Sequence, residues 1–189
     1  MTERGIHVDT LRPIPYINAD AELVSRLRRK LALSGKRVCG ITWRSQNAPY
    51  SDAKSMSLDD MVPVLSDPET IYVSLQYGDV RDEIENFRRR TGIEIVQCDE
   101  VDNFRDLDGH AALIEACDFV ILVSNTTAHL AGALGKTGYV ALPYARGMFF
   151  YWVPREEGRS YWYPSLRLFD QGSDGDWGNV MQKIAECIR

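Results

Sequence analysis

The chain has 189 residues, of which 44% are hydrophobic and 26% are charged, and its formal net charge is −5. A chain of this length buries roughly 70% of the surface that it exposes when unfolded, so it can build one ordinary hydrophobic core. The composition excludes a disordered tail, a collagen and a coiled-coil rod. A general nucleic-acid binder needs a basic face, which the net negative charge does not support. We therefore expect a globular chain with no nucleic-acid partner.

The cysteines and the apolar segments indicate the cellular compartment in which we expect the protein. The four cysteines form no CxxC pair, and Cys39 and Cys117 stand inside apolar runs that are typical of buried free thiols. This usage favours a reducing compartment. No segment resembles a signal peptide or approaches the roughly 20 apolar residues of a membrane-spanning helix. We expect a cytoplasmic protein without a membrane span.

Short apolar runs alternate along the chain with segments of helical spacing. Residues 1–19 predict an extended arm or linker ahead of a domain over residues 20–189. Leucine spacing predicts a first helix from Asp20 to Leu33. Strands are predicted at 37–43, 70–76, 93–97, 118–124, 138–142 and 167–169. Further helices are predicted at 57–65, 79–90, 108–116, 126–134 and 177–187, and the aromatic stretch 144–165 is predicted to be irregular.

This alternation is typical of a parallel sheet covered by helices on both faces. The right-handed crossover rule favours a doubly wound, Rossmann-like α/β fold with about six strands in the order 3-2-1-4-5-6. In that order the first and fourth strands are neighbours, and the crevice between their carboxyl ends is the usual ligand site. The loops after Trp43 and after Ser124 are therefore the expected site.

Small hydroxyl and amide residues open the helix that follows the fourth strand. The first amides of a helix have no partner inside it, and the helix dipole adds positive charge there, so such a terminus binds phosphate. A helix merely capped by Asn125 or Thr126 is the alternative, and the position at the crevice favours phosphate. His129, one turn further on, is explained equally well as a packed core residue or as a ligand.

The loop after the first strand is long and polar, and it carries two cations, Arg44 and Lys54. A cation beside a helix N-terminus would neutralise a diphosphate, although both side chains could also be ordinary solvated loop cations. The first strand is followed by no GxGxxG fingerprint, and the three histidines show no metal spacing. The sequence therefore predicts neither a nicotinamide site nor a metal site.

Several of these segments resemble the donor-binding half of GT-B glycosyltransferases. More specifically, they are similar to the catalytic region that follows tetratricopeptide repeats in bacterial relatives of O-GlcNAc transferase and of the heptosyltransferases. The most specific match is the run TAHLAGALGK at 127–136. The other matching segments are 40–43 with Asn47, 54–58, 73–76, 162–169, Gln171 and 176–177. The resemblance covers roughly residues 14–189.

The resemblance implies one half of a GT-B fold that binds a nucleoside diphosphate sugar as substrate, without a metal or other cofactor. It implies that amides of the segment 125–130 hold the diphosphate and that the loop 47–54 adds a polar residue and a cation. It also implies that the strand end 74–76 lies by the base, with His110 where O-GlcNAc transferases have a histidine near the uracil. Crevice and resemblance together give these candidate donor-binding residues: Arg44, Asn47, Lys54, Ser74, Leu75, Gln76, His110, Asn125, Thr126, Thr127, His129 and Leu130.

Two functions remain open at this point. GT-B enzymes close two Rossmann-like domains over the reaction, and only one fits in 189 residues. The first hypothesis is therefore the donor-binding domain of an inverting glycosyltransferase whose acceptor domain comes from elsewhere, with no catalytic residue assigned. The alternative is a non-catalytic nucleotide-binding or interaction module, for which the aromatic stretch 144–163 would supply the partner surface.

Overall fold

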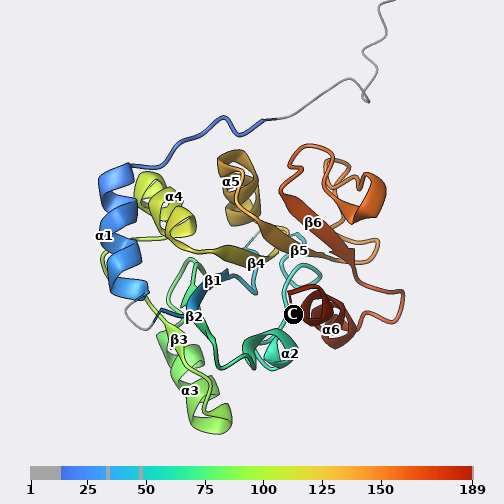
Figure 1. Ribbon diagram of the computed structural model, residues 1–189. Coiled ribbons are helices and arrows are strands. Elements are labelled where there is room, and N and C mark those ends of the chain that lie inside the picture. Colours follow the sequence, from blue (N-terminus) through green and yellow to red (C-terminus); the bar gives the residue numbers. More distant parts are fainter. Residues whose placement is uncertain (1–13, 33–34, 47–48, 189) are drawn as a thin grey trace, which may run out of the picture.

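One parallel sheet organises the computed structural model, which describes residues 14–32, 35–46 and 49–188 (Figure 1). Its strand order is β3-β2-β1-β4-β5-β6, and every neighbouring pair is parallel. The strands are β1 (Arg37–Ile41), β2 (Thr70–Ser74), β3 (Ile95–Val96), β4 (Phe119–Val123), β5 (Gly138–Leu142) and β6 (Leu166–Asp170). The predicted doubly wound α/β fold and its strand order are confirmed.

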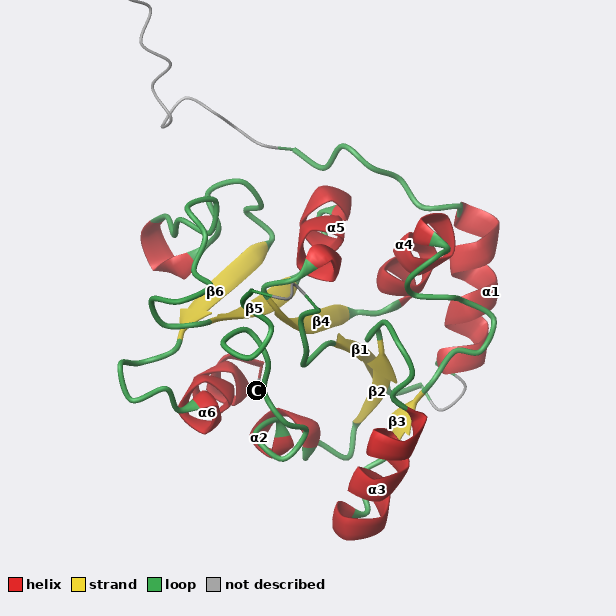
Figure 2. Ribbon diagram, turned by 180° about the vertical axis from the view of Figure 1, so that it is seen from behind, coloured by secondary structure: helices red, strands yellow, loops and turns green. Residues whose placement is uncertain are grey.

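Helices cover both faces of this sheet (Figures 1 and 2). One face carries α1 (Ala21–Leu31), α4 (Leu107–Ala116) and α5 (Thr126–Leu134). The other face carries α2 (Val62–Leu65), α3 (Arg81–Thr91) and α6 (Trp177–Ile188), and a short 3-10 helix, η2 (Glu156–Gly158), precedes β6. Within the described ranges, no helix has the length and apolar character needed to cross a membrane.

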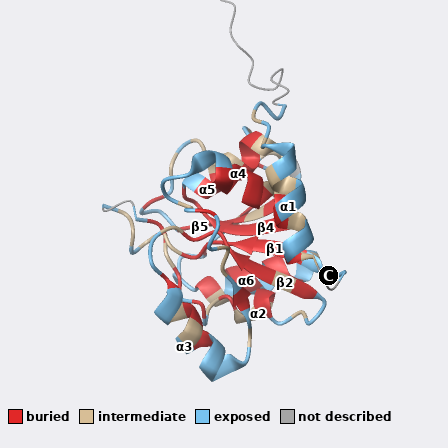
Figure 3. Ribbon diagram, turned by 90° about the vertical axis from the view of Figure 1, so that its left-hand side faces the viewer, coloured by how far each residue is buried: buried red, intermediate tan, exposed pale blue. Residues whose placement is uncertain are grey.

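The two faces of the sheet bury separate cores because successive strand side chains point to opposite faces. In β4, Val120 and Leu122 pack under α1, α4 and α5, whereas Ile121 and Val123 pack under α2, α3 and α6. All five residues of β4 are buried, and Figure 3 shows the buried strands between the partly exposed helices. Burial on both faces explains why the sequence of β4 is a continuous apolar run and does not alternate between apolar and polar residues. The predicted burial of Cys39 and Cys117 is confirmed, and both thiols are free.

The helix predicted at 57–65 is wrong in its first half, because α2 begins only at Val62. A helix from Ser57 would place Pro63 in its interior, where proline lacks the required amide and its ring clashes with the preceding turn. Instead, Ser57 and Asp60 cap each other. The Ser57 amide donates to the Asp60 carboxylate at 2.8 Å, and the Asp60 amide donates to Ser57 Oγ at 3.2 Å. The segment before Val62 is therefore a series of turns.

The remaining element boundaries lie within two residues of prediction. β1 and β2 end at Ile41 and Ser74, two residues early, because the amides of Trp43 and Gln76 donate to side chains instead of to a neighbouring strand. The Trp43 amide, for example, donates to the side chain of Gln76 at 3.1 Å. Asp20 is the N-cap of α1, with its carboxylate accepting from the Leu23 amide at 2.8 Å.

The described part of the predicted arm, residues 14–19, lies along α5. The amides of Tyr16 and Ile17 both donate to the carbonyl of Ala133, at 3.0 and 3.3 Å. The ring of Pro15 packs so close to Gly135 that a Cβ there would stand 2.4 Å from it. Residues 1–13 lie outside the described residues, so the division of the chain at residue 20 stays a prediction.

Candidate functional site

The N-terminus of α5 offers unpaired hydrogen-bond donors at the centre of the sheet. Asn125 is its N-cap: Oδ1 accepts from the Ala128 amide at 3.3 Å, and Nδ2 donates to the carbonyl of Arg44 at 3.2 Å. The predicted meeting of the two crevice loops is thus made by this side chain. The amides of Thr126 and Thr127 have no acceptor among the described residues. Ser124 Oγ is buried beside them without a hydrogen-bond partner there.

The two predicted cations of the β1 loop lie in different environments. The guanidinium of Arg44 forms an ion pair with Glu83 of α3, 2.5 Å from Oε2, and its side chain is 43% exposed. Trp43 holds the same carboxylate, its Nε1 donating to Oε1 at 3.0 Å. The charge of Arg44 is therefore already neutralised within the protein. Asn47, the polar residue predicted in this loop, lies outside the described residues.

Lys54 is only 4% exposed and has no carboxylate within ion-pair distance among the described residues. Its ammonium lies 4.9 Å from the centroid of the Phe149 ring, which gives it a cation–π contact. Burial lowers the pKa of Lys54 because the charged form loses solvation. Burying an uncompensated charge is costly, so this geometry favours an anionic ligand that pairs with the ammonium.

His129 lies in the second turn of α5, among aromatic rings. Its ring stacks on Trp152 with centroids 4.7 Å apart, and its Nδ1 lies 3.1 Å from the hydroxyl of Tyr163. Burial, and then the charge of Lys54, lower the pKa of His129. The histidine is half-buried, so it packs in an aromatic cluster and still reaches the surface. Both of its predicted explanations, core residue and ligand, agree with this position.

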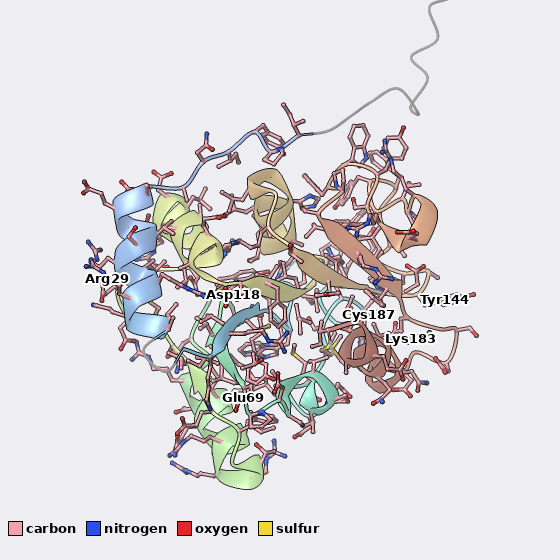
Figure 4. All side chains as sticks on the ribbon, viewed as in Figure 1. Arg29, Glu69, Asp118, Tyr144, Lys183 and Cys187 are labelled. Carbon is pink, nitrogen blue, oxygen red and sulfur yellow. The ribbon has the colours of Figure 1, made fainter. Side chains whose placement is uncertain are left out.

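The aromatic stretch after β5 is partly core and partly surface. Trp152 is 3% exposed and packs with α4 and α5, whereas Phe150 is 85% exposed. Tyr144 lies at the edge of the molecule in Figure 4 and is also exposed. Beside α5, rings of this stretch and of the arm surround a pocket of about 370 Å³.

The end of β2 borders a polar cleft of about 940 Å³ that also touches the loop at 99–105. Ser74 and Gln76 line the cleft, whereas the side chain of Leu75 is fully buried in the core. Gln76 braces the β1 loop, because its Oε1 accepts from the amides of Trp43 and Arg44 at 3.1 and 2.9 Å. Of the three predicted residues, Ser74 and Gln76 therefore face the cleft, and Leu75 contributes packing.

His110 is 3% exposed, and both of its ring nitrogens have partners inside the protein. Nδ1 lies 2.9 Å from Oδ1 of Asn103, and Nε2 lies 3.1 Å from Oγ1 of Thr127. Burial lowers the pKa of His110 to about 4, against a weaker opposing effect of Asp106. The ring is therefore neutral in the folded protein, and it connects the loop beside the cleft to the first turn of α5.

The predicted residues of α5 face two sides of that helix. Thr127 is buried toward α4, whereas Thr126 is exposed and borders, with His129 and Leu130, a pocket of about 660 Å³ beside the arm. Sequence analysis missed Asn103, Glu83 and the unpaired hydroxyl of Ser124. Their roles depend on partners far away in the chain, which no local pattern indicates. No group of three or more His, Cys, Asp or Glu side chains that could hold a metal occurs in the described part of the chain.

Comparisons with known proteins agree with this geometry at the level of the fold. No protein-family model matches the chain. Over 151 residues the chain is 36% identical to protein FlbA of Caulobacter vibrioides, a match that spans 79% of this chain and 24% of FlbA.

Solved glycosyltransferases share the architecture. The E. coli ADP-heptose lipopolysaccharide heptosyltransferase II superposes with a TM-score of 0.61 and 14% identity, over 95% of this chain and 54% of that chain. A family 9 glycosyl transferase from Veillonella parvula superposes with a TM-score of 0.58 and 10% identity, over 95% of this chain and 49% of that chain. The E. coli heptosyltransferase WaaC, solved with ADP, superposes with a TM-score of 0.54 and 11% identity, over 93% of this chain and 51% of that chain.

The chain thus spans about half the length of these glycosyltransferases and about a quarter of FlbA. Its doubly wound, Rossmann-like fold is shared with these solved glycosyltransferases, as predicted. The narrower resemblance to O-GlcNAc transferase relatives with tetratricopeptide repeats stays a prediction.

Proposed function

We propose that this chain is the nucleotide-sugar-binding domain of an inverting, metal-independent glycosyltransferase that obtains its acceptor site from another domain or subunit. The observation that carries the proposal is Lys54, a buried cation without an anionic partner among the described residues, whose charge acts on His129 of the helix that begins with unpaired amides. The shared fold of the heptosyltransferases supports the same conclusion.

The chemistry of this site would stabilise a departing nucleoside diphosphate. As the glycosidic bond breaks, negative charge develops on the diphosphate oxygens. The amides of Thr126 and Thr127 and the ammonium of Lys54 would offset this charge from fixed positions, which is the way preorganised donors accelerate a reaction. Lys54 would supply positive charge that a divalent ion supplies in other transferases.

The polar cleft at the ends of β2 and β3 would take the nucleoside. Its volume of about 940 Å³ lies in the range of small-molecule sites, and Ser74 and Gln76 place polar groups at its wall. Asn125 bonds to the carbonyl of Arg44, whose amide in turn bonds to Gln76, so the phosphate end and the base end share one hydrogen-bonded frame.

A ligand panel tests the proposal. Calorimetry of the full chain with ADP, UDP, GDP and CDP, each in EDTA and in Mg²⁺, should find at least one diphosphate that binds without the metal. The matching nucleoside should bind at least about tenfold more weakly, because it lacks the phosphates that Lys54 and α5 would hold. Equal affinity for nucleoside and diphosphate, or binding only with Mg²⁺, would contradict the proposal.

A non-catalytic interaction module is the second candidate, and the exposed aromatic surface favours it. Phe150 is 85% exposed and Trp162 is 45% exposed, and aromatic side chains are enriched at protein interfaces. The candidates differ in one measurement. A module would bind the nucleoside diphosphate without transferring the sugar, even when the complete protein is supplied with acceptor, whereas a donor domain would then support transfer.

A further inference from the structure

The amide of Asn103 can adopt only one orientation that satisfies its neighbours. One end of the amide lies 3.3 Å from the carbonyl oxygens of both Ser74 and Gln76. Carbonyl oxygens only accept, so this end is the Nδ2 donor, and Oδ1 faces His110. Since Oδ1 can only accept, the Nδ1 nitrogen of His110, 2.9 Å away, carries a proton.

The proton on Nδ1 determines what the other ring nitrogen does. His110 is 3% exposed, and burial lowers its pKa to about 4, so near pH 7 its ring carries one proton. Nε2 is then an acceptor, and the Thr127 hydroxyl, 3.1 Å away, is the donor. A hydroxyl has one proton to donate, so the proton of Thr127 is already used inside the protein.

Thr126 differs from Thr127 in both exposure and direction. Thr126 is exposed on the face of α5 that carries His129 one turn later, and no described residue bonds to its hydroxyl. The charge of buried Lys54 acts on that same histidine. The free hydroxyl of Thr126 and the unpaired amides of Thr126 and Thr127 therefore lie together at the N-terminus of α5.

We propose that His110 is a positioning residue whose Nδ1-protonated ring holds the Thr127 hydroxyl away from ligand, so that the Thr126 hydroxyl donates to the bound phosphate. This assignment rests on the proposed function, because it takes the anion at α5 to be a diphosphate. His110 acts through Thr127 and Asn103, which fix the first turn of α5 against the wall of the cleft.

A matched pair of variants tests the division of roles between the threonines. Thr126→Val and Thr127→Val each replace a hydroxyl by a methyl group of the same shape, and inorganic pyrophosphate is the probe. Thr126→Val should weaken pyrophosphate binding about tenfold, as expected for one hydrogen bond to a charged group. Thr126→Ser, which keeps the hydroxyl, should stay within about twofold of the original chain. Thr127→Val keeps the Thr127 amide and should weaken pyrophosphate binding less than Thr126→Val does.

The ¹⁵N chemical shifts of the imidazole give an independent readout in the ligand-free protein. His110 should show a protonated Nδ1 and an unprotonated Nε2, and Thr127→Val should shift the Nε2 resonance while Thr126→Val leaves it unchanged. A protonated Nε2 would overturn the tautomer, and a larger loss of pyrophosphate affinity in Thr127→Val than in Thr126→Val would overturn the role of Thr126.

The failure of the proposed function would look different. If the original chain binds neither pyrophosphate nor any nucleoside diphosphate, the phosphate role of Thr126 fails together with the proposed function. The tautomer of His110 and its link to Thr127 are then still decided by the resonances of the ligand-free protein.

Discussion

The two loops that meet at the centre of the sheet are built in different ways. The connection from β4 to α5 has only two residues, Ser124 and Asn125, and its cap and first turn are local structure. The connection from β1 to α2 spans residues 42–61 and is held by distant partners such as Gln76 and Glu83. The short loop supplies fixed donors, and the long loop supplies the charges.

The long loop also separates two cations that look equivalent in sequence. Arg44 pairs with Glu83 and is 43% exposed, whereas Lys54 is buried and has no ion-pair partner among the described residues. A paired, exposed cation contributes little to binding or stability. A buried, unpaired cation reduces stability unless a ligand pairs with it. The difference indicates Lys54, and not Arg44, as the group that binds an anion.

The largest effect that we expect lies on the α5 side and concerns acid stability. The pKa of His110 is about 4 in the folded protein against 6.5 for a free histidine, so the unfolded chain binds the extra proton first as the pH falls. The free energy of unfolding should therefore fall between about pH 6.5 and pH 4, by about 3 kcal/mol in total. Urea unfolding at several pH values measures this loss.

The control for this titration is His110→Gln, which cannot gain a charge. Carboxylates that titrate in the same window contribute equally to both proteins, so the difference between the two pH profiles isolates the histidine. If the profiles have the same slope, His110 is not the buried neutral group that links Thr127 to Asn103.

The next effect concerns Lys54 in the long loop. Removing its charge should lower the affinity for a nucleoside diphosphate without lowering the stability of the ligand-free protein. Lys54→Met keeps the aliphatic stem and removes the charge. Nucleoside diphosphate affinity should fall by about 1.5–3 kcal/mol, the range for a hydrogen bond to a charged group, while nucleoside affinity changes little. The ligand-free protein should not be less stable, because an unpaired buried charge is gone. Calorimetry measures the two affinities, and urea unfolding measures the stability. Equal losses of affinity for nucleoside and nucleoside diphosphate would show that Lys54 does not bind the phosphates.

Sequence analysis predicted the fold and the N-terminus of α5 more completely than it predicted the long loop between β1 and α2. The bounds of α5 and β5 agree with prediction to the residue, because Asn125 is a local cap and Gly135 ends the helix in the left-handed conformation that glycine favours. The ion pair of Arg44 joins it to a carboxylate 39 positions away in sequence. Such pairing depends on packing that no local spacing records, which is why Arg44 and Lys54 appear equivalent in the sequence.

A third effect tests how closely α5 must approach the segment that covers it. A Cβ on Gly132 would lie 2.2 Å from Cγ of the Tyr163 ring, an atom that cannot move without shifting the whole side chain. Gly132→Ala should therefore destabilise the protein by about 1–3 kcal/mol, although alanine is the better helix former by about 1 kcal/mol. In the matched control, Gly172→Ala, the new Cβ meets only the flexible carboxylate of Asp174, so the change should stay within about 0.5 kcal/mol. Equal effects in the two variants would show that the close approach of α5 is not required.

The smallest effect is expected at Arg44, and it decides whether the two cations of the long loop really differ. Arg44→Met removes a charge that Glu83 already neutralises, so it should change stability by less than about 1 kcal/mol. Its effect on nucleoside diphosphate affinity should stay within about twofold, because the guanidinium is held by α3 and is not free to pair with phosphate. The same calorimetric titrations as for Lys54→Met measure this. If Arg44→Met weakens diphosphate binding as much as Lys54→Met does, the ion pair with Glu83 must open when the ligand arrives. In that case, the burial of Lys54 and its lack of an ion-pair partner would not identify it as the cation that binds the ligand.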